Sequence, residues 1–258
     1  MKHTAMKIAF STILAFTLAA CQGTAAPAEK YGIIGAMDPE VTSLQESLAD
    51  AKTEVIADMT FVSGKLGETE AVVVKCGMGK VNAAICAHTL INRYGVTKVI
   101  NTGVGGSLDN RIDIGDIVVS TEAVQHDYDV SIIGFRKGEI PYTGLIAFPA
   151  DPDLQEEAKK AIRETAPEIK VFEGRVCSGD QFIASSEQKQ EILDNFGGLC
   201  CEMEGAAIAQ TCYLNHVPYV ILRAISDKAD HSEEVSFEQF AETAAKRCAA
   251  IVHAMVQG

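Results

Sequence analysis

Two carboxylates, Glu202 and Glu204, flank a methionine in the segment CEMEGAAIAQ, which is predicted to run from a buried strand into an apolar helix. Charges this close to a protein core are costly unless they are paired or hydrogen-bonded. The segment therefore indicates one of two arrangements. Either another side chain pairs with these carboxylates, or a ligand with hydroxyl groups binds beside them.

Four other predicted strands also end in residues that could do chemistry. Each group has an ordinary explanation, such as a helix first-turn charge at Glu40, a tight turn at the glycines, or an ion pair between Arg223 and Asp227. Their recurrence at five successive strand ends favours a shared site instead. The segments are GIIGAMDPE with Asp38 and Glu40, NTGVGG with Gly103, Gly105 and Gly106, SGDQFIAS with Phe182 and Ile183, CEMEG, and RAISDKAD with Arg223, Ser226 and Asp227.

The pattern around these residues predicts an α/β fold. Short apolar runs alternate with segments of helical periodicity, which implies a largely parallel or mixed central sheet covered by helices on both sides. Ligands of such folds gather at the carboxyl ends of the strands. The predicted strands are 31–37, 71–77, 98–104, 115–124, 171–179 and 219–227, and the predicted helices are 80–94, 152–165, 203–216 and a last helix that starts near Ser236.

Composition narrows the class of protein. The chain has 258 residues, 47% of them hydrophobic, and a formal net charge of −13. This length suits one sizeable α/β domain, and the acidic balance argues against nucleic acid or a polybasic membrane patch. The cysteines that follow Cys21 are odd in number and have no repeated spacing, so they predict core packing rather than a disulfide framework or a metal site.

The N-terminus predicts export. Residues 1–20 combine basic residues with an apolar run too short to span a bilayer, as in a secretory signal. The run ends in Leu-Ala-Ala-Cys21, which resembles the lipobox of bacterial lipoproteins, whose cysteine is acylated. We therefore expect a lipid anchor at Cys21, a tether over 21–29 and a folded domain over 30–258, facing the periplasm or the cell surface. An ordinary signal peptide cut near Ala20, or a buried N-terminal helix, is the alternative.

Together, the motifs resemble those of the 5′-methylthioadenosine/S-adenosylhomocysteine nucleosidases of the purine nucleoside phosphorylase superfamily. GIIGAM, NTG, DIVVS, SGDxFI, EMEG and RAISDxAD occur in family order across 30–258. The resemblance implies a three-layer α/β/α sandwich with a central mixed sheet, usually a homodimer. It also implies hydrolysis of the bond between adenine and the thioribose, without metal or cofactor. The family has a stretch similar to HDYD (126–129) that binds no metal, and GMGK (77–80) lacks the full phosphate-loop pattern.

The implied roles fit the chemistry. Cleavage of an N-glycosidic bond builds positive charge on the ribose and negative charge on the leaving purine, so it needs an acid and a base. By resemblance Asp227, after Ser226, is the acid that protonates purine N7, which requires a raised pKa. Glu40 is the base that orients the water, and Arg223 helps to hold both.

The resemblance also assigns the substrate contacts. Glu204 accepts hydrogen bonds from both ribose hydroxyls, and Glu202 joins the network of Arg223 and the water. Met203 packs against the sugar, Phe182 stacks on the adenine, and the backbone of Ile183 reads the purine edge. The apolar pocket for the 5′ substituent falls on Met37, Met78, Val104 and Phe237, with Ile133, Phe135 and Pro141 of the partner subunit. Relatives often have an aromatic residue at Ile133 and a small hydroxyl residue at Val104, so the 5′-group preference stays open.

Three alternatives stay open. A phosphorylase of the same fold needs cationic groups around phosphate, whereas Asp38 and Glu40 would repel it, so hydrolysis is favoured. The same hydrolase chemistry could act on another purine nucleoside, for example one of the futalosine type. A non-catalytic surface lipoprotein that binds a nucleoside or a host ligand would suit the exported address, but it need not keep Glu40, Glu204, Arg223 and Asp227.

Overall fold

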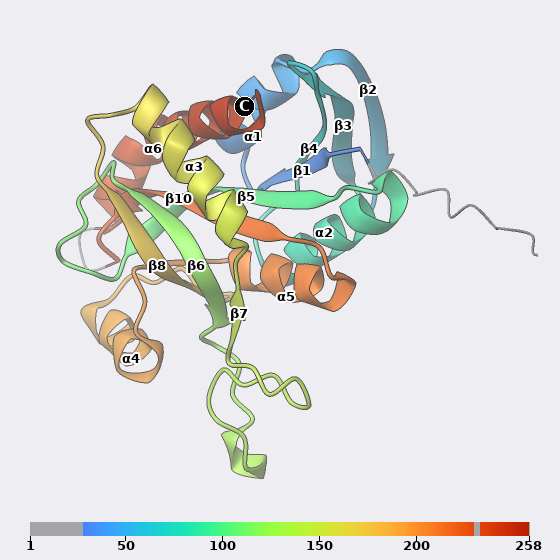
Figure 1. Ribbon diagram of the computed structural model, residues 1–258. Coiled ribbons are helices and arrows are strands. Elements are labelled where there is room, and N and C mark those ends of the chain that lie inside the picture. The colour runs from blue at the N-terminus through green and yellow to red at the C-terminus, as the bar shows by residue number, and fades with distance from the viewer. Residues whose placement is uncertain (1–27, 230–232, 258) are drawn as a thin grey trace, which may run out of the picture.

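The apolar runs of the sequence form the centre of one mixed sheet in the computed structural model, which describes residues 28–229 and 233–257 (Figure 1). The predicted fold class is confirmed. The strands are β1 (Lys30–Gly35), β2 (Ala49–Ile56), β3 (Met59–Leu66), β4 (Thr69–Lys75), β5 (Lys98–Ser107), β6 (Ile117–Gln125), β7 (Ala147–Pro149), β8 (Val171–Ser178), β9 (Cys200–Glu202) and β10 (Tyr219–Asp227).

Helices cover both faces of the sheet. The helices are α1 (Asp38–Glu46), α2 (Lys80–Tyr94), α3 (Pro152–Thr165), α4 (Ser186–Phe196), α5 (Gly205–Asn215) and α6 (Glu233–Gln257), with a 3₁₀ turn η1 (Ser131–Ile133). The predicted bounds of α2 and α3 are confirmed, and α6 begins three residues before the predicted start. An N-cap residue explains where α3 begins, because the side chain of Asp151 accepts a hydrogen bond from the Leu154 N–H at 3.0 Å.

Half of the sheet closes on itself. The strand order is β10-β6-β8-β9-β5-β1-β4-β3-β2, and β10 also pairs with β5. The pairings β5–β10, β10–β6, β6–β8, β8–β9 and β9–β5 thus form a ring. This closure brings the carboxyl ends of β5 and β10 beside β9, which is where the carboxylates of the CEMEG segment lie.

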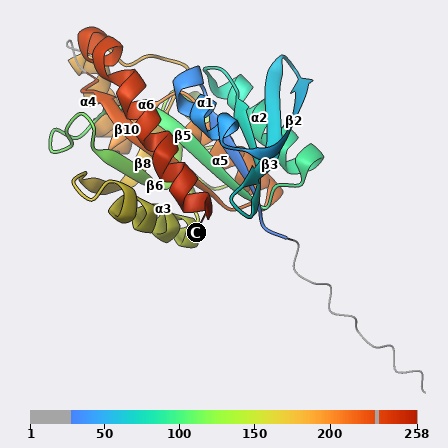
Figure 2. The ribbon, with the colours of Figure 1, turned by 90° about the horizontal axis from the view of Figure 1, so that it is seen from above.

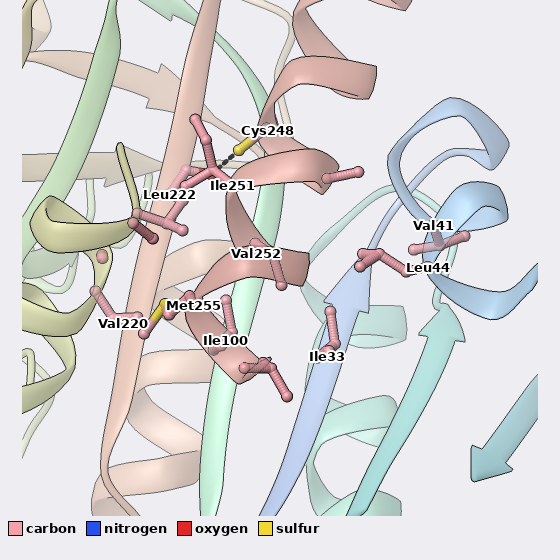
Figure 3. Close-up of a cluster of buried hydrophobic side chains, with 14 of the residues drawn as sticks. Ile33, Val41, Leu44, Ile100, Val220, Leu222, Cys248, Ile251, Val252 and Met255 are labelled. Carbon is pink, nitrogen blue, oxygen red and sulfur yellow. Dashed lines mark hydrogen bonds between the residues drawn. The ribbon is translucent and has the colours of Figure 1, made fainter. Parts of the chain in front are cut away.

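Two apolar layers hold the helices to the sheet. On one face α6 lies across the sheet beside α1 and α3 (Figure 2). Its residues Cys248, Ile251, Val252 and Met255 point at the strands (Figure 3). On the other face, α2 and α5 pack on the sheet and on each other. The seven cysteines after Cys21 are all buried and free, as the sequence predicts for core residues.

The β2–β3 hairpin was not predicted from the sequence. Most of β2 is exposed at the edge of the sheet, so its sequence ADAKTEVI lacks an apolar run. Its turn residues Ala57 and Asp58 have φ angles of 51° and 59°, as a two-residue hairpin turn requires. No helix in the described ranges is long and apolar enough to cross a membrane.

Candidate active site

A pocket opens at the carboxyl edge of the sheet and gathers residues from all five predicted segments. It is lined by the ends of β5 and β10, the start of α1, and the loops before α2, α4 and α5. Most of the residues that the sequence singled out therefore lie together. Those that line the pocket are Met37, Glu40, Met78, Val104, Gly105, Gly106, Phe182, Ile183, Glu202, Met203, Glu204, Ser226 and Asp227.

The first turn of α1 holds Glu40 in one orientation. Its Oε2 accepts hydrogen bonds from the N–H groups of Ala36 at 2.6 Å and Met37 at 2.9 Å, and its Oε1 accepts from the Val104 N–H at 3.1 Å. Burial raises the pKa of Glu40, although Arg223 and these N–H donors act against the rise. Glu40 is thus a fixed carboxylate that accepts a proton more readily than an exposed glutamate.

Arg223 lies behind the pocket and pairs the carboxylates of CEMEG. Its side chain is 1% exposed, and its Nη2 donates to Glu202 Oε2 and, at 2.6 Å, to Asn101 Oδ1. The same nitrogen lies 3.6 Å from Glu204 Oε2. Burial alone would lower the pKa of Arg223, but the carboxylates of Glu202, Glu204 and Glu40 raise it above its usual value. The ion-pair arrangement predicted for this segment is therefore present.

Glu202 also fixes the position of Glu204. Its Oε2 accepts from the N–H groups of Glu204 at 3.0 Å and Gly205 at 2.8 Å, at the N-terminus of α5. Its Oε1 accepts from Ser178 Oγ, which in turn accepts from the Ala206 N–H at 2.7 Å. Both oxygens of this buried carboxylate accept hydrogen bonds, and those on Oε2 orient the start of the helix.

Glu204 is the less satisfied of the two carboxylates. It lies at the N-cap of α5, and its Oε1 accepts from the Gly79 N–H at 2.9 Å. Burial, and then the neighbouring Glu202, raise the pKa of Glu204 to about 7. A ligand with hydroxyl donors would stabilise its ionised form, as the second arrangement inferred from the sequence requires.

Asp227 ends β10 where the strand leaves register with β5, between Ile225 and Asp227. Its Oδ2 accepts from Ser226 Oγ at 2.8 Å, and its Oδ1 accepts from the Ala229 N–H at 2.9 Å. Ala229 has a φ of 49°, an uncommon value for a residue with a side chain, in the turn that brings this N–H back to Asp227. The side chain is buried, and it lines the pocket.

Glycines in β5 let the strand pass close to these groups. A Cβ at Gly106 would lie 2.7 Å from Asp227 Oδ1, and one at Gly103 would overlap Arg223 Nη1. The NTGVGG segment is therefore part of β5, with close approaches at its glycines, rather than a tight turn. Any side chain at these positions would displace Asp227 or Arg223.

The apolar walls are partly open. Phe182 is 50% exposed and Met78 is 62% exposed, whereas Ile183 and Val104 are buried. Met37 and Met203 are half-buried.

Five other predicted residues lie away from this pocket or outside the described residues. Ile133, Phe135 and Pro141 lie in the segment between β6 and β7, which extends away from the body of the molecule (Figure 1). They do not line the pocket of their own chain, which leaves open their predicted contact with a partner's pocket. Phe237 lies in α6, but its side chain, like Cys21, lies outside the described residues.

Sequence reasoning missed several residues that build the site. Cys201 and Gln181 line the pocket, while Asn101, Ser178 and Gly79 hold its carboxylates. Asn101 had a usable signal, because a polar side chain inside the apolar run VINTGV must find a buried partner. Gly79 had none, since it acts through its backbone N–H.

Known proteins match this chain over nearly its whole folded length. The model of the phosphorylase superfamily matches residues 30–257. A 5′-methylthioadenosine/S-adenosylhomocysteine nucleosidase of Shewanella loihica is 41% identical over 229 residues, covering 88% of this chain and 99% of the relative. The structure of such a nucleosidase from Neisseria meningitidis with methylthio-immucillin-A has a TM-score of 0.85 at 37% identity, over 89% of this chain and 99% of that one. A futalosine hydrolase of Helicobacter pylori has a TM-score of 0.84 at 35% identity, over 89% and 97%.

Proposed function

Because the chain belongs to the 5′-methylthioadenosine/S-adenosylhomocysteine nucleosidases of the phosphorylase superfamily, we propose that it hydrolyses the N-glycosidic bond of both nucleosides and releases adenine and the thioribose. One observation carries the proposal. Glu40, Glu204 and Asp227 line a single pocket from three different elements, and such a set supplies a base, a ribose ligand and an acid.

Asp227 is the proposed acid. Protonation of purine N7 neutralises the leaving group, and Asp227 is the carboxyl group that ends β10 in the pocket. Once the proton has left, the carboxylate is stabilised by the donors already in place, Ser226 Oγ on Oδ2 and the Ala229 N–H on Oδ1. The pair of donors thus favours the state that follows proton transfer.

Glu40 is the proposed base. Its three backbone hydrogen bonds fix the carboxylate while the water approaches the anomeric carbon, and its raised pKa makes it a better proton acceptor. Arg223 pairs with Glu202 and acts on Glu40 through its positive charge, so it is a positioning residue in this proposal.

The remaining residues bind the nucleoside. Glu204 accepts from the ribose hydroxyls, and its charge stabilises the oxocarbenium-like transition state. Met203 packs on the sugar, Phe182 stacks on adenine, and the Ile183 backbone reads the purine edge. The proposed wall around the 5′ group consists of Met37, Met78, Val104 and Phe237.

Hydrolysis is favoured over phosphorolysis by the charge of the pocket. Among the pocket-lining residues in the described part of the chain, none is Lys, Arg or His, while four are Asp or Glu. Phosphate would meet Glu40 without a compensating cation in the lining. The test is adenine release by the purified protein from methylthioadenosine, S-adenosylhomocysteine and futalosine, with and without phosphate.

We expect release from the first two substrates without phosphate. Release only with phosphate would make the protein a phosphorylase and remove the proposed role of Glu40. Release from futalosine alone would keep the mechanism and change the substrate. Binding without release from any of them would leave a nucleoside-binding lipoprotein with the fold of an enzyme.

We also propose that the protein is a homodimer. Ile133 is 68% exposed, and its neighbours Ile132 and Tyr142 are 95% and 98% exposed. An apolar segment this exposed is typical of a surface that a partner covers. In the proposed dimer Ile133, Phe135 and Pro141 complete the partner's 5′ pocket.

Export with a lipid anchor at Cys21 is a further part of the proposal, and the lipobox-like sequence supports it. The acidic domain would then be held at a bacterial membrane by acyl chains rather than by surface charge, since the whole chain has a formal net charge of −13.

A further inference from the structure

The loop over residues 76–79, between β4 and α2, forms one wall of the pocket. Met78 lines the pocket, and the Gly79 N–H donates to Glu204 Oε1 at 2.9 Å. Gly77 and Gly79 have φ angles of 81° and 98°, so the loop depends on backbone conformations that few other residues adopt. The position of this loop therefore sets both the edge of the 5′ pocket and the orientation of Glu204.

A closed set of three contacts fastens this loop. Lys80 Nζ lies 2.6 Å from Asp127 Oδ1, and Asp127 Oδ2 accepts from the Asp180 N–H at 2.9 Å. Asp180 Oδ1 in turn accepts from the Lys80 N–H at 2.8 Å. The Lys80–Asp127–Asp180 ring thus joins the starts of three segments, which follow β4, β6 and β8.

The ion pair between Lys80 and Asp127 is partly buried, whereas Asp180, the third member of the ring, is exposed. The side chains of Lys80 and Asp127 are only 17% and 18% exposed. Burial would raise the pKa of Asp127, but the hydrogen bonds from Lys80 and Asp180 lower it overall, so this carboxylate stays charged. Ion pairs at this depth are screened less than exposed ones.

The ring links opposite parts of the proposed nucleoside site. Asp180 directly precedes Gln181, Phe182 and Ile183, which line the pocket where the purine is proposed to bind. Gly79 approaches Asp180 so closely that a Cβ on it would lie 3.1 Å from Asp180 Oδ1. The two walls of the pocket are thus fastened to each other directly.

We propose that Lys80, Asp127 and Asp180 are positioning residues, which hold the loop with Met78 and Gly79 against the purine-binding segment and thereby keep Glu204 oriented for the ribose. The GMGK segment, through Lys80, and the HDYD segment, through Asp127, thus both help to position the pocket walls. None of the three ring residues lines the pocket itself. The inference rests on the proposed function for its kinetic readout.

An ion pair between β6 and β8, the strands that precede Asp127 and Asp180, provides a matched control. Arg175 Nη2 on β8 lies 2.6 Å from Glu122 Oε1 on β6, with side chains 30% and 34% exposed. Neither residue lines the pocket. Loss of this pair removes a contact of similar chemistry without touching the loop.

The experiment compares Asp127→Ala and Lys80→Met with Glu122→Ala, measuring kcat, KM and Tm for adenine release from methylthioadenosine. Small displacements of substrate-positioning groups can cost up to about 100-fold in rate, so we expect kcat/KM to fall about 10- to 100-fold in the first two variants. We expect less than about a twofold change in Glu122→Ala. Lys80→Arg, which keeps the charge and the donors, should recover most of the activity.

A parallel calorimetric titration with adenine separates the inference from the proposed function. Adenine should bind the two ring variants more weakly than it binds Glu122→Ala, whether or not the wild type is catalytic. Absence of adenine release by the wild type, with the adenine difference intact, would reject only the proposed function. Equal kcat/KM and equal adenine affinity in Asp127→Ala, Lys80→Met and Glu122→Ala would overturn the ring's role.

Discussion

We expect the buried carboxylate of Glu204 to lower the free energy of unfolding, although it contributes to substrate binding. The substitution Glu204→Gln tests this expectation. The residue is 5% exposed, and burial with the neighbouring Glu202 raises its pKa from 4.5 to about 7. Because the folded pKa lies above the unfolded one, the unfolded chain releases this proton first as the pH rises. Folding therefore loses stability between about pH 4.5 and 7, and the loss is complete above pH 7.

The size of the loss follows from the two pKa values. Their difference corresponds to about 3 kcal/mol once Glu204 is ionised in both states. A part of this loss is already present at pH 5, because the unfolded carboxyl is then mostly ionised. Between pH 5 and pH 8 the free energy of unfolding should thus rise by about 2 to 3 kcal/mol in Glu204→Gln relative to the wild type.

Urea unfolding at both pH values measures this change, followed by circular dichroism because the chain has no tryptophan. With a slope of about 3 kcal/mol per molar urea, the midpoint difference between variant and wild type should move by about 1 M between the two pH values. Effects of the substitution that do not depend on pH, such as the altered contact with Arg223, are the same at both pH values and therefore cancel in this comparison. Glu70→Gln, at an exposed glutamate, controls for the loss of one surface carboxylate.

The same substitution should lower adenine release by about 100-fold or more, because it removes the charge beside the developing cation. Stability at pH 8 and turnover should therefore change in opposite directions. A stability difference between Glu204→Gln and the wild type that stays the same at pH 5 and pH 8 would refute the reasoning. It would mean that burial in the folded protein does not raise the pKa of Glu204.

Three further predictions test the proposed roles. Asp227→Asn should keep nucleoside binding, measured by calorimetry, and lose about 10²- to 10⁴-fold in turnover; normal turnover would remove the acid assignment. Ile133→Asp should lower kcat/KM for methylthioadenosine about tenfold or more and shift the protein toward monomer in sedimentation, with adenine affinity unchanged; an unaltered dimer with unaltered kcat/KM would argue against the shared pocket. Cys21→Ser should move the protein from the membrane to the soluble fraction of the expressing cells, and retention at the membrane would count against the lipobox interpretation.

Periodicity and capping made the helices on the sheet faces predictable. The sequence predicts α2 and α3 with their observed bounds, since each alternates apolar and polar faces and ends at a recognisable signal, such as Gly95 in the left-handed conformation after α2. It does not predict α1 or α4, which are 9 and 11 residues long and bury few side chains. Short elements leave too few apolar positions to establish a period.

The site was predictable where a side chain at a strand end carries the chemistry, and unpredictable where long-range contacts hold that side chain. The sequence places Glu202 with Arg223, but the third partner, Asn101, is 122 residues away from Arg223. The Gly79 N–H that meets Glu204 is separated from it by 125 residues. Such contacts depend on the closure of β5, β10, β6, β8 and β9 into a ring, and local patterns do not encode that closure.

Exposure of the apolar residues around the pocket connects catalysis with assembly. Within one chain, Met78 of the proposed 5′ wall is 62% exposed, so a methylthio group bound against it would remain in contact with water. Water at this end of the substrate would weaken apolar binding and raise the dielectric around Glu204 and Glu40. The carboxylates gain their raised pKa values from burial, so a pocket completed by the partner's Ile133 would strengthen the same effect. On this reasoning we expect the dimer, rather than the single chain, to be the catalytic unit.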